Sequence, residues 1–582
     1  MDTSPRTCVP RVDRWLGLSS NMVIMACGGL TYTYAVYSGH MKDVLHYTQE
    51  QTDDVGAAKD FGSILGLLSG FFFNYYPPWV TIYIGSFIHL FGYSMVWMTL
   101  VGTVSPSFWL LCTYFTLGVG GDSYIDTGCI ITTLESFGDN RGTAMGLLKA
   151  QVGLSGAIFV LIYEVFIEPD VNRFILLVAL APSIAGFALA FLTRTFPPEY
   201  QDEDAEDIRQ RFRLTYGVLI ALGVFLMIVI TIKELLDPGR SVLAFFLIIM
   251  LMFASAMFTM PLIRRPVEFF SSYISPCDET EDVVEGISLR EFSRRPYRYK
   301  KKPFRPELED IHEEEESAAL KSSSEAESDD DIVVFKAGRD DTIDLEELLE
   351  PTLRSSLLGI DFWLITAVIM VGGGTGLAII NNFAQIGQAL GNGEADVYVG
   401  LISVWSCFGR LLGGYGSDFL LKRGYPRPIC LLMAQLLMST CCVLLSTGWV
   451  PFLYVGSCMV GMAYGSHWSI QPPILAEVFG LPHFPTLYKI NSCAAPIGAY
   501  LLSAKVVGVL YDKQATLFKS QAVNLVAENT CLGTQCFGSS LLVLAFLCAL
   551  SAILNFWFMI RTRSYYDQQQ PSPPSRVHVQ VD

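Results

Sequence analysis

Apolar and polar positions alternate along this chain in long blocks, and the apolar blocks are long enough to cross a lipid bilayer. Runs of about 20 apolar residues, the length that a membrane-spanning helix needs, recur throughout the sequence. The predicted spans are 19–39, 55–73, 79–101, 108–134, 142–167, 173–193, 214–232, 241–262, 360–382, 397–420, 429–448, 451–471, 487–510 and 539–560. The pattern predicts an all-α polytopic membrane protein of about 14 spans, grouped as six, two and six.

Polar stretches between these spans predict how the chain is divided. The predicted parts are a cytoplasmic N-terminus (1–18), an N-terminal six-helix bundle (19–193), two additional transmembrane helices (194–265), a cytoplasmic insert (266–358), a C-terminal six-helix bundle (359–562) and a cytoplasmic tail (563–582). The insert is first basic and then acidic and rich in serine. Such a composition leaves too little apolar surface to bury, so we predict a disordered linker.

Composition and charge support the membrane assignment. Hydrophobic residues make up 51% of the chain and charged residues only 16%, and the mean hydropathy is +0.40, which excludes a single soluble domain. The net charge of −17 says little about partners, because the acidic residues concentrate in the insert. Lys and Arg fall on alternate loops, which predicts that both termini are cytoplasmic.

A glycine-rich turn is the most distinctive polar feature between spans. The segment 409–428 contains Gly414, followed four residues later by Asp418, and basic residues that include Arg423. Glycines allow helix backbones to approach closely, and charge pairs at a helix end can hold a gate. The segment resembles the loop signature of the major facilitator superfamily of secondary transporters. Its counterpart in the first half has Gly70 followed by Asn74, so only the second copy keeps the charge.

We therefore predict a set of gating residues, with an ordinary polar turn between two helices as the alternative. The set comprises Gly414, Asp418, Arg410, Arg423, Asn74, Glu135, Arg141 and Glu477.

Two acids lie inside a predicted span. Asp122 and Asp126 are four residues apart, hence on one helix face, near the middle of 108–134. A charge at that depth is costly unless it is paired or faces water, so the pair predicts a proton or cation relay in which one carboxyl group holds a proton. A structural pair with a neighbouring helix is the alternative. Lys149 is the predicted positive partner or anion-binding group, unless its side chain extends to the cytoplasmic surface.

Other polar residues within spans are candidates for the same pathway. His89 and His467 could titrate, although a lone buried histidine is often a packing residue. Tyr34, Asn381 and Asn382 lie in glycine-rich spans that could line a central cavity or form a packing face.

Two features outside the spans suggest sorting and oxidation. Asp344, Leu348 and Leu349 fit the acidic dileucine pattern that adaptor proteins recognise, although the first turn of an amphipathic helix explains them equally well. This motif predicts an endosomal, lysosomal or vacuolar membrane, with the plasma membrane as the alternative. Cys531 and Cys536 lie in a loop predicted to be non-cytosolic, where we expect a disulfide.

Several ordered motifs resemble the plant Nodulin-like proteins of the Nuclear Fusion Defective type. They are the segment 58–101, the run from Thr127 and Gly128 to Asn140-Arg141-Gly142-x-x-x-Gly146-Leu147-Leu148-Lys149, the run from Glu477 to Pro496, and Tyr511-Asp512. The resemblance covers nearly all the membrane portion and implies the major facilitator fold, near oxalate/formate exchangers and monocarboxylate carriers, with a twelve-helix core and alternating access. Those proteins usually have uncharged residues where this chain has Asp122, Asp126, His89 and Lys489.

The expected function is secondary active transport of a small polar or anionic solute, with a monocarboxylate-like organic anion favoured and proton coupling expected. The alternative is a non-transporting membrane receptor or scaffold that signals through the insert. We find no nucleotide cradle, metal-ligand spacing or nucleophile elbow, so we predict no enzyme activity, cofactor or metal. The expected partners are the solute, the bilayer and adaptor proteins, without nucleic acid, and the expected state is a monomer.

Overall fold

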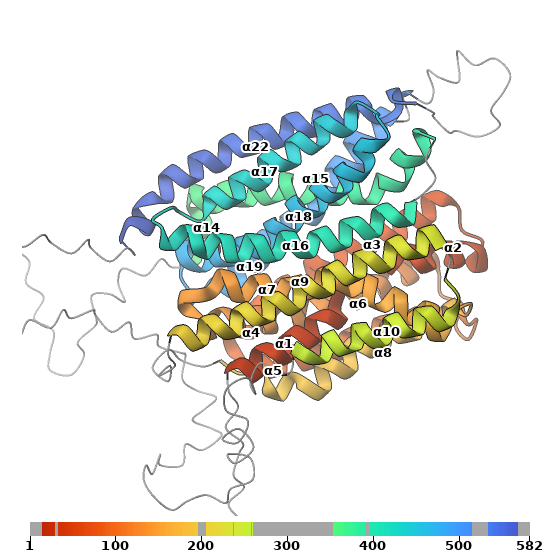
Figure 1. Ribbon diagram of the computed structural model, residues 1–582, viewed down its shortest axis with the longest axis horizontal. Coiled ribbons are helices and arrows are strands. Elements are labelled where there is room, and N and C mark those ends of the chain that lie inside the picture. The colour runs from red at the N-terminus through yellow and green to blue at the C-terminus, as the bar shows by residue number, and fades with distance from the viewer. Residues whose placement is uncertain are drawn as a thin grey trace, which may run out of the picture. The chain divides into compact units, whose positions relative to one another are not determined.

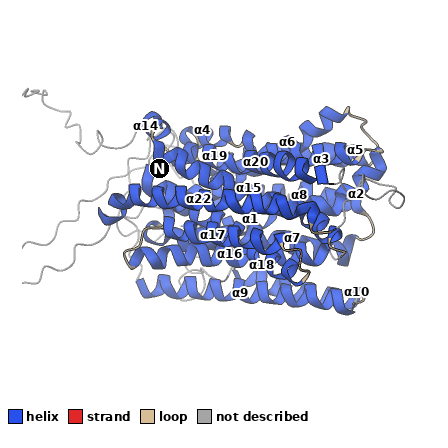
Figure 2. Ribbon diagram, turned by 90° about the horizontal axis from the view of Figure 1, so that it is seen from above, coloured by secondary structure: helices blue, strands red, loops and turns tan. Residues whose placement is uncertain are grey.

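The computed structural model describes residues 14–29, 33–195, 205–236, 238–257, 259, 353–391, 395–511, 513–514 and 533–568. All of them belong to one compact unit. Every regular element in these ranges is a helix, and Figure 2 shows no strand among the described parts. The prediction of an all-α membrane protein is therefore confirmed.

The N-terminal bundle is built around one long helix. Its helices are α1 (Arg14–Gly28), α2 (Tyr34–Leu45), α3 (Gln49–Leu65), α4 (Leu67–Tyr75), α5 (Pro78–Leu100), α6 (Phe108–Ser136), α7 (Arg141–Ile162) and α8 (Val171–Leu189). Helix α6 packs closely on α5 and α3. Glycines allow this contact, because a Cβ atom at Gly121 would lie 2.4 Å from the backbone nitrogen of His89.

The C-terminal bundle follows the same plan. Its helices are α14 (Leu353–Leu358), α15 (Ile360–Ala389), α16 (Ala395–Lys422), α17 (Pro428–Ser446), α18 (Pro451–Phe479), α19 (Phe484–Ser492), α20 (Ala494–Tyr500), a π-helix (Leu501–Gly508) and α22 (Gln535–Gln568). Helix α16 packs on α18 within this bundle and on α7 of the other bundle. The bundle interface is therefore formed in part by α7 and α16.

Two further helices, α9 (Ala205–Leu236) and α10 (Arg240–Ala256), come between the bundles in sequence, and α9 contacts both of them (Figure 1). The hydroxyl group of Tyr216 on α9 donates to the Thr143 carbonyl oxygen on α7 at 3.0 Å. Gly223 of α9 lies against the ring of Phe408 on α16. Helix α9 thus lies along the seam between α7 and α16.

Each predicted span overlaps one to three of these helices. Among the described residues, eight helical segments are long and apolar enough to cross a membrane by length and composition. They are Pro78–Leu100, Gly138–Ile167, Val171–Leu192, Ala205–Lys233, Ile360–Phe383, Pro428–Ser446, Phe484–Tyr511 and Gln535–Tyr566. The full number of spans stays a prediction.

Several boundaries differ from the sequence-based ones. The predicted insert ends at 358, but its last residues form α14. The predicted tail begins at 563, but α22 continues to Gln568. The second predicted span, 55–73, is divided at Gly66, where a Cβ atom would lie 2.5 Å from the Ser123 side chain on α6. Hydropathy marks apolar stretches, whereas polar helix ends and packing breaks depend on contacts with other helices.

The apolar core shows where the bundles join. One large cluster contains residues of both bundles, from Trp15 on α1 to Phe484 on α19 and Phe558 on α22. Two smaller clusters are each confined to one bundle, around Phe174 in the first and around Phe537 in the second. The shared cluster includes the start of α1 and α19 and the end of α18, whereas the separate clusters include the start of α8 and α22. The bundles therefore share a core at one end only.

Candidate functional site

A carboxylate in the middle of α6 joins the two bundles. Asp126 accepts a hydrogen bond from the Nζ atom of Lys149 on α7 at 2.6 Å. It accepts a second one from the Nζ atom of Lys489 on α19 at 3.1 Å. Lys149 belongs to the same bundle as Asp126, and Lys489 belongs to the other. The ion pair between Asp126 and Lys489 is therefore a direct link across the interface.

Both lysines are buried, with 6% exposure for Lys149 and 4% for Lys489. A buried ammonium group costs several kcal/mol unless it is paired, and Asp126 supplies the pairing for both. The Tyr488 hydroxyl lies 3.4 Å from the same carboxylate. Because the ammonium group of Lys149 is held by Asp126 on the neighbouring helix, its side chain does not extend to a membrane surface.

A third cation lies in the same region. Arg410 on α16 is 2% exposed, and its guanidinium group packs on α7, where a Cβ atom at Gly153 would lie 2.5 Å from its Nη1 atom. Among the described residues, no hydrogen-bond acceptor reaches the Nε or Nη1 atom of Arg410. Arg410 and Lys489 are both close enough to Lys149 to act on its charge. We predicted Arg410 to be a gating residue, but the structure places it against the middle of α7, beside Lys149.

We call Asp126, Lys149, Lys489 and Arg410 the interface cluster. Three positive charges and one negative charge leave two positive charges in excess. Asp126 is the most accessible member, with 22% of its side chain exposed. A buried site with this charge balance favours an anion.

The second predicted acid has a partner of its own. Asp122 lies with its Oδ1 atom 2.8 Å from the Nδ1 atom of His89 on α5. We expected Asp122 and Asp126 to share one proton because they lie on one helix face. The structure instead gives each carboxylate separate basic partners on neighbouring helices, which sequence spacing could not reveal.

The remaining pathway candidates lie within single bundles. Tyr34 donates its hydroxyl to the Thr52 carbonyl oxygen at 2.8 Å. Asn382 donates to the Ser503 hydroxyl at 2.9 Å, and Asn381 is exposed. The Nδ1 atom of His467 lies 2.7 Å from the Ala463 carbonyl oxygen of its own helix. These contacts do not involve the interface cluster.

The predicted gating acid makes the second polar link between the bundles. Asp418, at the end of α16, accepts hydrogen bonds from the backbone nitrogens of Gly142 and Thr143 at 3.1 and 2.6 Å, and from the Thr143 hydroxyl at 2.6 Å. These donors form the first turn of α7, whose free N–H groups and positive dipole end favour an anion. Asp418 thus caps a helix of the opposite bundle.

Arg427 supports this cap from the loop after α16. Its Nη1 atom lies 2.6 Å from Asp418, and its Nε atom donates to Glu477 at 2.7 Å. Burial alone would lower the pKa of Arg427, but the carboxylates of Glu477 and Asp418 hold this pKa above its ordinary value. The predicted partner Arg423 instead stacks on the Phe419 ring, 4.2 Å from its centroid, in an exposed position.

The other predicted gating residues surround this link. Arg141, at the start of α7, acts on the charges of both Glu135 and Glu477, which come from opposite bundles. Gly414 packs directly on α7, because a Cβ atom there would lie 2.4 Å from the Gly142 carbonyl oxygen. Asn74 lies on α4, at the corresponding place in the first half.

Sequence reasoning missed two members of these sites. Lys489 was noted as a charge where the resembling proteins are usually uncharged, but it was not assigned to the site, because its partner Asp126 is 363 residues away. Arg427 was one of several basic residues in its loop, and only its direct position before α17 distinguished it.

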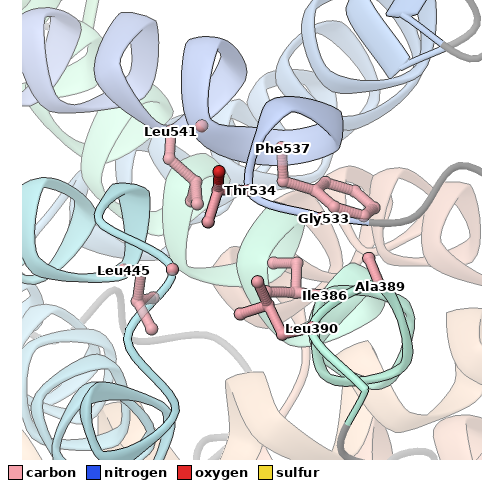
Figure 3. A pocket seen from close by; sticks show the side chains of 10 residues that line it. Ile386, Ala389, Leu390, Leu445, Gly533, Thr534, Phe537 and Leu541 are labelled. Atoms are coloured by element: carbon pink, nitrogen blue, oxygen red, sulfur yellow. The ribbon is translucent and has the colours of Figure 1, made fainter. Parts of the chain in front are cut away.

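A small pocket in the C-terminal bundle offers no alternative site. It holds about 10 Å³, barely the volume of one water. Figure 3 shows that its walls are the apolar side chains of Ile386, Leu390, Phe537 and Leu541, with the Thr534 hydroxyl among them. Its lining carries no charged group.

Two predicted features fall outside the described residues. Asp344, Leu348 and Leu349 of the sorting motif lie there, as does Cys531. Cys536 is disulfide-bonded to a partner outside the described ranges. Its pairing with Cys531 stays a prediction.

Comparison with known proteins adds sequence relatives. A family model described as Nodulin-like matches residues 14–263, and one described as the C-terminal domain of NFD4 matches residues 347–568. Protein NUCLEAR FUSION DEFECTIVE 4 of Arabidopsis thaliana is 23% identical over 594 residues, which cover 96% of this chain and 91% of that protein.

Solved structures share the fold. The major facilitator superfamily proton:xylose symporter XylE, bound to 6-bromo-6-deoxy-D-glucose, matches with a TM-score of 0.51 and 10% identity over 94% of this chain and 95% of that chain. A double-tryptophan mutant of XylE matches with a TM-score of 0.53 and 11% identity, over 95% and 98% of the two chains. At such identity the likeness concerns the fold.

Proposed function

Because a Nodulin-like model and an NFD4 C-terminal model match the chain, and because its fold is that of major facilitator superfamily transporters, we propose that it is a secondary transporter of a small organic anion that works by alternating access. The observation that carries the proposal is the charge balance of the interface cluster. Two buried lysines share a single carboxylate, and the third buried cation, Arg410, has two guanidinium nitrogens without an acceptor among the described residues. A carboxylate is the anion that matches a guanidinium group best, through two parallel hydrogen bonds.

The position of the cluster links solute binding to bundle movement. Asp126 pairs with Lys489 and links α6 to α19. A bound carboxylate competes with Asp126 for Lys489, because both are anions that seek the same ammonium group. Solute binding therefore weakens a contact between the bundles, and the bundles can then rock.

Proton coupling completes the proposal. A membrane potential changes the free energy of a moving charge by about 2.3 kcal/mol per 100 mV. The potential therefore opposes the entry of an anion alone into a negatively charged compartment. A proton that moves with the anion removes this opposition and supplies a driving force. We therefore propose that a proton accompanies the carboxylate.

Uptake into proteoliposomes tests this function. The probes are radiolabelled formate, lactate, pyruvate and oxalate, with glucose as the neutral comparison. We expect one or more carboxylates, and not glucose, to accumulate when an inward proton gradient is applied. Accumulation of glucose alone, or of no carboxylate, would contradict the proposal.

Arg410→Gln tests whether Arg410 binds the carboxylate solute. A hydrogen bond to a charged group contributes about 1.5–3 kcal/mol, so we expect uptake at low solute concentration to fall roughly tenfold to a hundredfold. Arg209→Gln is the matched control, because Arg209 is 67% exposed on α9. Equal uptake by both variants, with both folded by thermal unfolding, would remove Arg410 from the site.

A further inference from the structure

A second buried acid–base pair lies within the N-terminal bundle. His89 is fully buried, and Asp122 keeps 13% of its side chain exposed. The pair joins α5 to α6 through a contact of 2.8 Å between Nδ1 and Oδ1. It is separate from the interface cluster, whose acid has two lysine partners.

The geometry fixes how many protons the pair holds. The Nε2 atom of His89 lies 2.9 Å from the Val178 carbonyl oxygen, and a carbonyl can only accept, so Nε2 must carry a hydrogen. The Nδ1 atom lies 2.8 Å from Asp122 and 3.3 Å from the Gly118 carbonyl oxygen, and its short contact with Asp122 needs one more proton between two acceptors. That proton is on His89, giving an imidazolium and a carboxylate, or on Asp122, giving two neutral groups. In both cases the pair is neutral overall.

Loss of this proton leaves a buried negative charge. A carboxylate would then face the lone pair of Nδ1, and the described residues place no other hydrogen-bond donor on either oxygen of Asp122. An uncompensated buried charge is strongly unfavourable. Both carboxylate oxygens of Asp122 are buried, so the proton can leave only in a conformation in which water reaches them.

We propose that His89 and Asp122 form a proton-binding site of the carrier, distinct from the anion site at the interface cluster. This inference rests on the proposed transport function and gives that function its coupling site. The carrier takes up one proton at this pair and one carboxylate at the cluster. The bond that forms and breaks is the one between the proton and Nδ1 or Oδ1, and water is the donor and acceptor outside.

The two sites influence each other through Asp126. Asp126 lies one turn from Asp122 on the same helix face and acts on its charge. While both lysines pair with Asp126, its charge is largely neutralised. When a carboxylate draws Lys489 away, the uncovered charge of Asp126 favours retention of the proton on the pair. Anion binding therefore strengthens proton binding, as symport requires.

Among the described residues around the pair, no other group could neutralise its deprotonated form. Tyr93 on α5 and Tyr37 on α2 are buried and interact with each other beside Asp122. Asp60 on α3 acts on these tyrosines, and it pairs with Lys59 at 3.0 Å. On α8 the facing group is the Val178 carbonyl. The two lysines of the interface cluster are already paired with its own acid.

Infrared difference spectroscopy tests proton binding without any solute. The full-length protein in lipid vesicles is titrated between about pH 5 and about pH 8, the range where histidine usually changes charge. A proton on Asp122 predicts loss of the carboxyl C=O band as the pH rises, and a proton on His89 predicts that the imidazolium ring bands give way to those of the neutral ring. We expect one of these two changes in the wild type. Both Asp122→Asn and His89→Gln should abolish this change, because each removes one member of the pair, and Asp361→Asn, at a partly exposed ion pair of the C-terminal bundle, should keep it.

Two results would overturn the proposal. One is a wild type with neither the carboxyl nor the histidine change, and the other is a change that survives in a folded Asp122→Asn or His89→Gln variant. The spectra need no transported solute, so this test of proton binding does not depend on the outcome of the carboxylate uptake experiment.

Transport supplies the second readout. The probe is whichever of the four carboxylates accumulates. For each variant we compare its uptake driven by a pH gradient with its counterflow, the exchange of labelled for unlabelled solute. In Asp122→Asn this ratio should fall to the value that is measured in vesicles without a pH gradient. Wild-type dependence on the gradient in that variant would remove the pair from coupling even if carboxylate transport itself stands.

Discussion

The two bundles meet at one end through two junctions that share a geometry and differ in chemistry. In one junction Gly414 of α16 packs on the start of α7, and in the other Gly70 of α4 packs on the start of α19. A Cβ atom would lie 2.4 Å from the Gly142 carbonyl oxygen in the first case and 2.7 Å from the Pro485 carbonyl oxygen in the second. Two halves of the chain thus use the same close helix approach.

The junctions differ in the residue that follows each glycine by four positions. It is Asp418 in the α16–α7 junction, where the acid accepts hydrogen bonds from Gly142 and Thr143. It is Asn74 in the α4–α19 junction. We call these the charged junction and the packed junction.

The receiving helices explain the difference. The first turn of α7 offers the Gly142 and Thr143 N–H groups to an acid. In the first turn of α19, the Phe484 N–H group already donates to the Leu481 carbonyl oxygen at 3.1 Å, and Pro485 has no N–H group. In that turn, therefore, at most the backbone N–H group of Thr486 could donate to a capping acid. An acid is therefore useful in one junction and has few donors to bind in the other.

The comparison suggests a division of roles between the junctions. Hydrogen bonds to a charged group are directional and are lost once donor and acceptor separate. The charged junction should therefore hold a closed state and break abruptly. Packing between backbones changes gradually with sliding, so the packed junction should act as a pivot.

The largest effect should follow from Asp418→Ala. This change removes the cap of α7 and leaves Arg427 as a buried charge at 1% exposure with one carboxylate partner fewer. Removing one partner of a buried pair costs about 3–5 kcal/mol. We expect a pronounced fall in the thermal unfolding temperature of the purified protein and a wider distance between spin labels placed across α16 and α7.

Asp361→Ala is the matched control, because Asp361 also pairs with an arginine near a helix end. That pair, with Arg561, is partly exposed, and exposed ion pairs contribute little. An Asp418→Ala variant as stable as this control, with an unchanged distance across the charged junction, would show that the cap does not hold the bundles together.

An intermediate effect should follow from Gly70→Ala in the packed junction. The new Cβ atom would meet backbone atoms of Pro485 and Thr486 at 2.7 and 2.9 Å, and backbone cannot turn aside as a flexible side chain can. Overpacking of this kind costs about 1–3 kcal/mol. We expect lower thermal stability and displacement of α4 from α19 in spin-label distances.

Gly416→Ala controls for the loss of a glycine. Gly416 lies in α16, and a Cβ atom added there would have no neighbour within 4 Å, so the substitution should raise helix stability by up to about 1 kcal/mol. A lower thermal stability for Gly70→Ala and a higher one for Gly416→Ala would confirm that contact across the junction decides the effect. Equal, small effects would show that α4 and α19 separate easily.

The sequence was informative about helices and less so about partners. Apolar runs predicted where most of the described bundle helices lie, because membrane spans need a fixed length of apolar residues. Asp126 and Lys149 stood out as charges at depth within neighbouring spans. Lys489 stood out as an unusual charge, but its role did not, because its partner is 363 residues away and only the folded chain brings them together.

The charged junction shows the same limit. Glycine spacing identified Gly414 and Asp418, but the loop offered Lys422, Arg423 and Arg427 as partners for the acid. Selection of Arg427 depends on its position at the start of α17, which directs it toward Asp418 and Glu477. Sequence spacing alone does not predict which of these basic residues contacts the acid.

The smallest effect should follow from Asn74→Asp, which gives the packed junction the acid of the charged one. An acid near a helix N-terminus contributes about 0.3–1 kcal/mol from the dipole alone, and the missing donor at Pro485 should hold the gain to the lower end. Combination with Pro485→Ala restores that N–H group. A double-mutant cycle on thermal unfolding should then show a favourable coupling between the two changes, of the order of a single charge-assisted hydrogen bond, about 1 kcal/mol or more. If Asn74→Asp stabilises the protein equally with and without Pro485, the number of free backbone N–H donors does not distinguish the junctions. The steric fit at Gly70 must then explain why only one of them is charged.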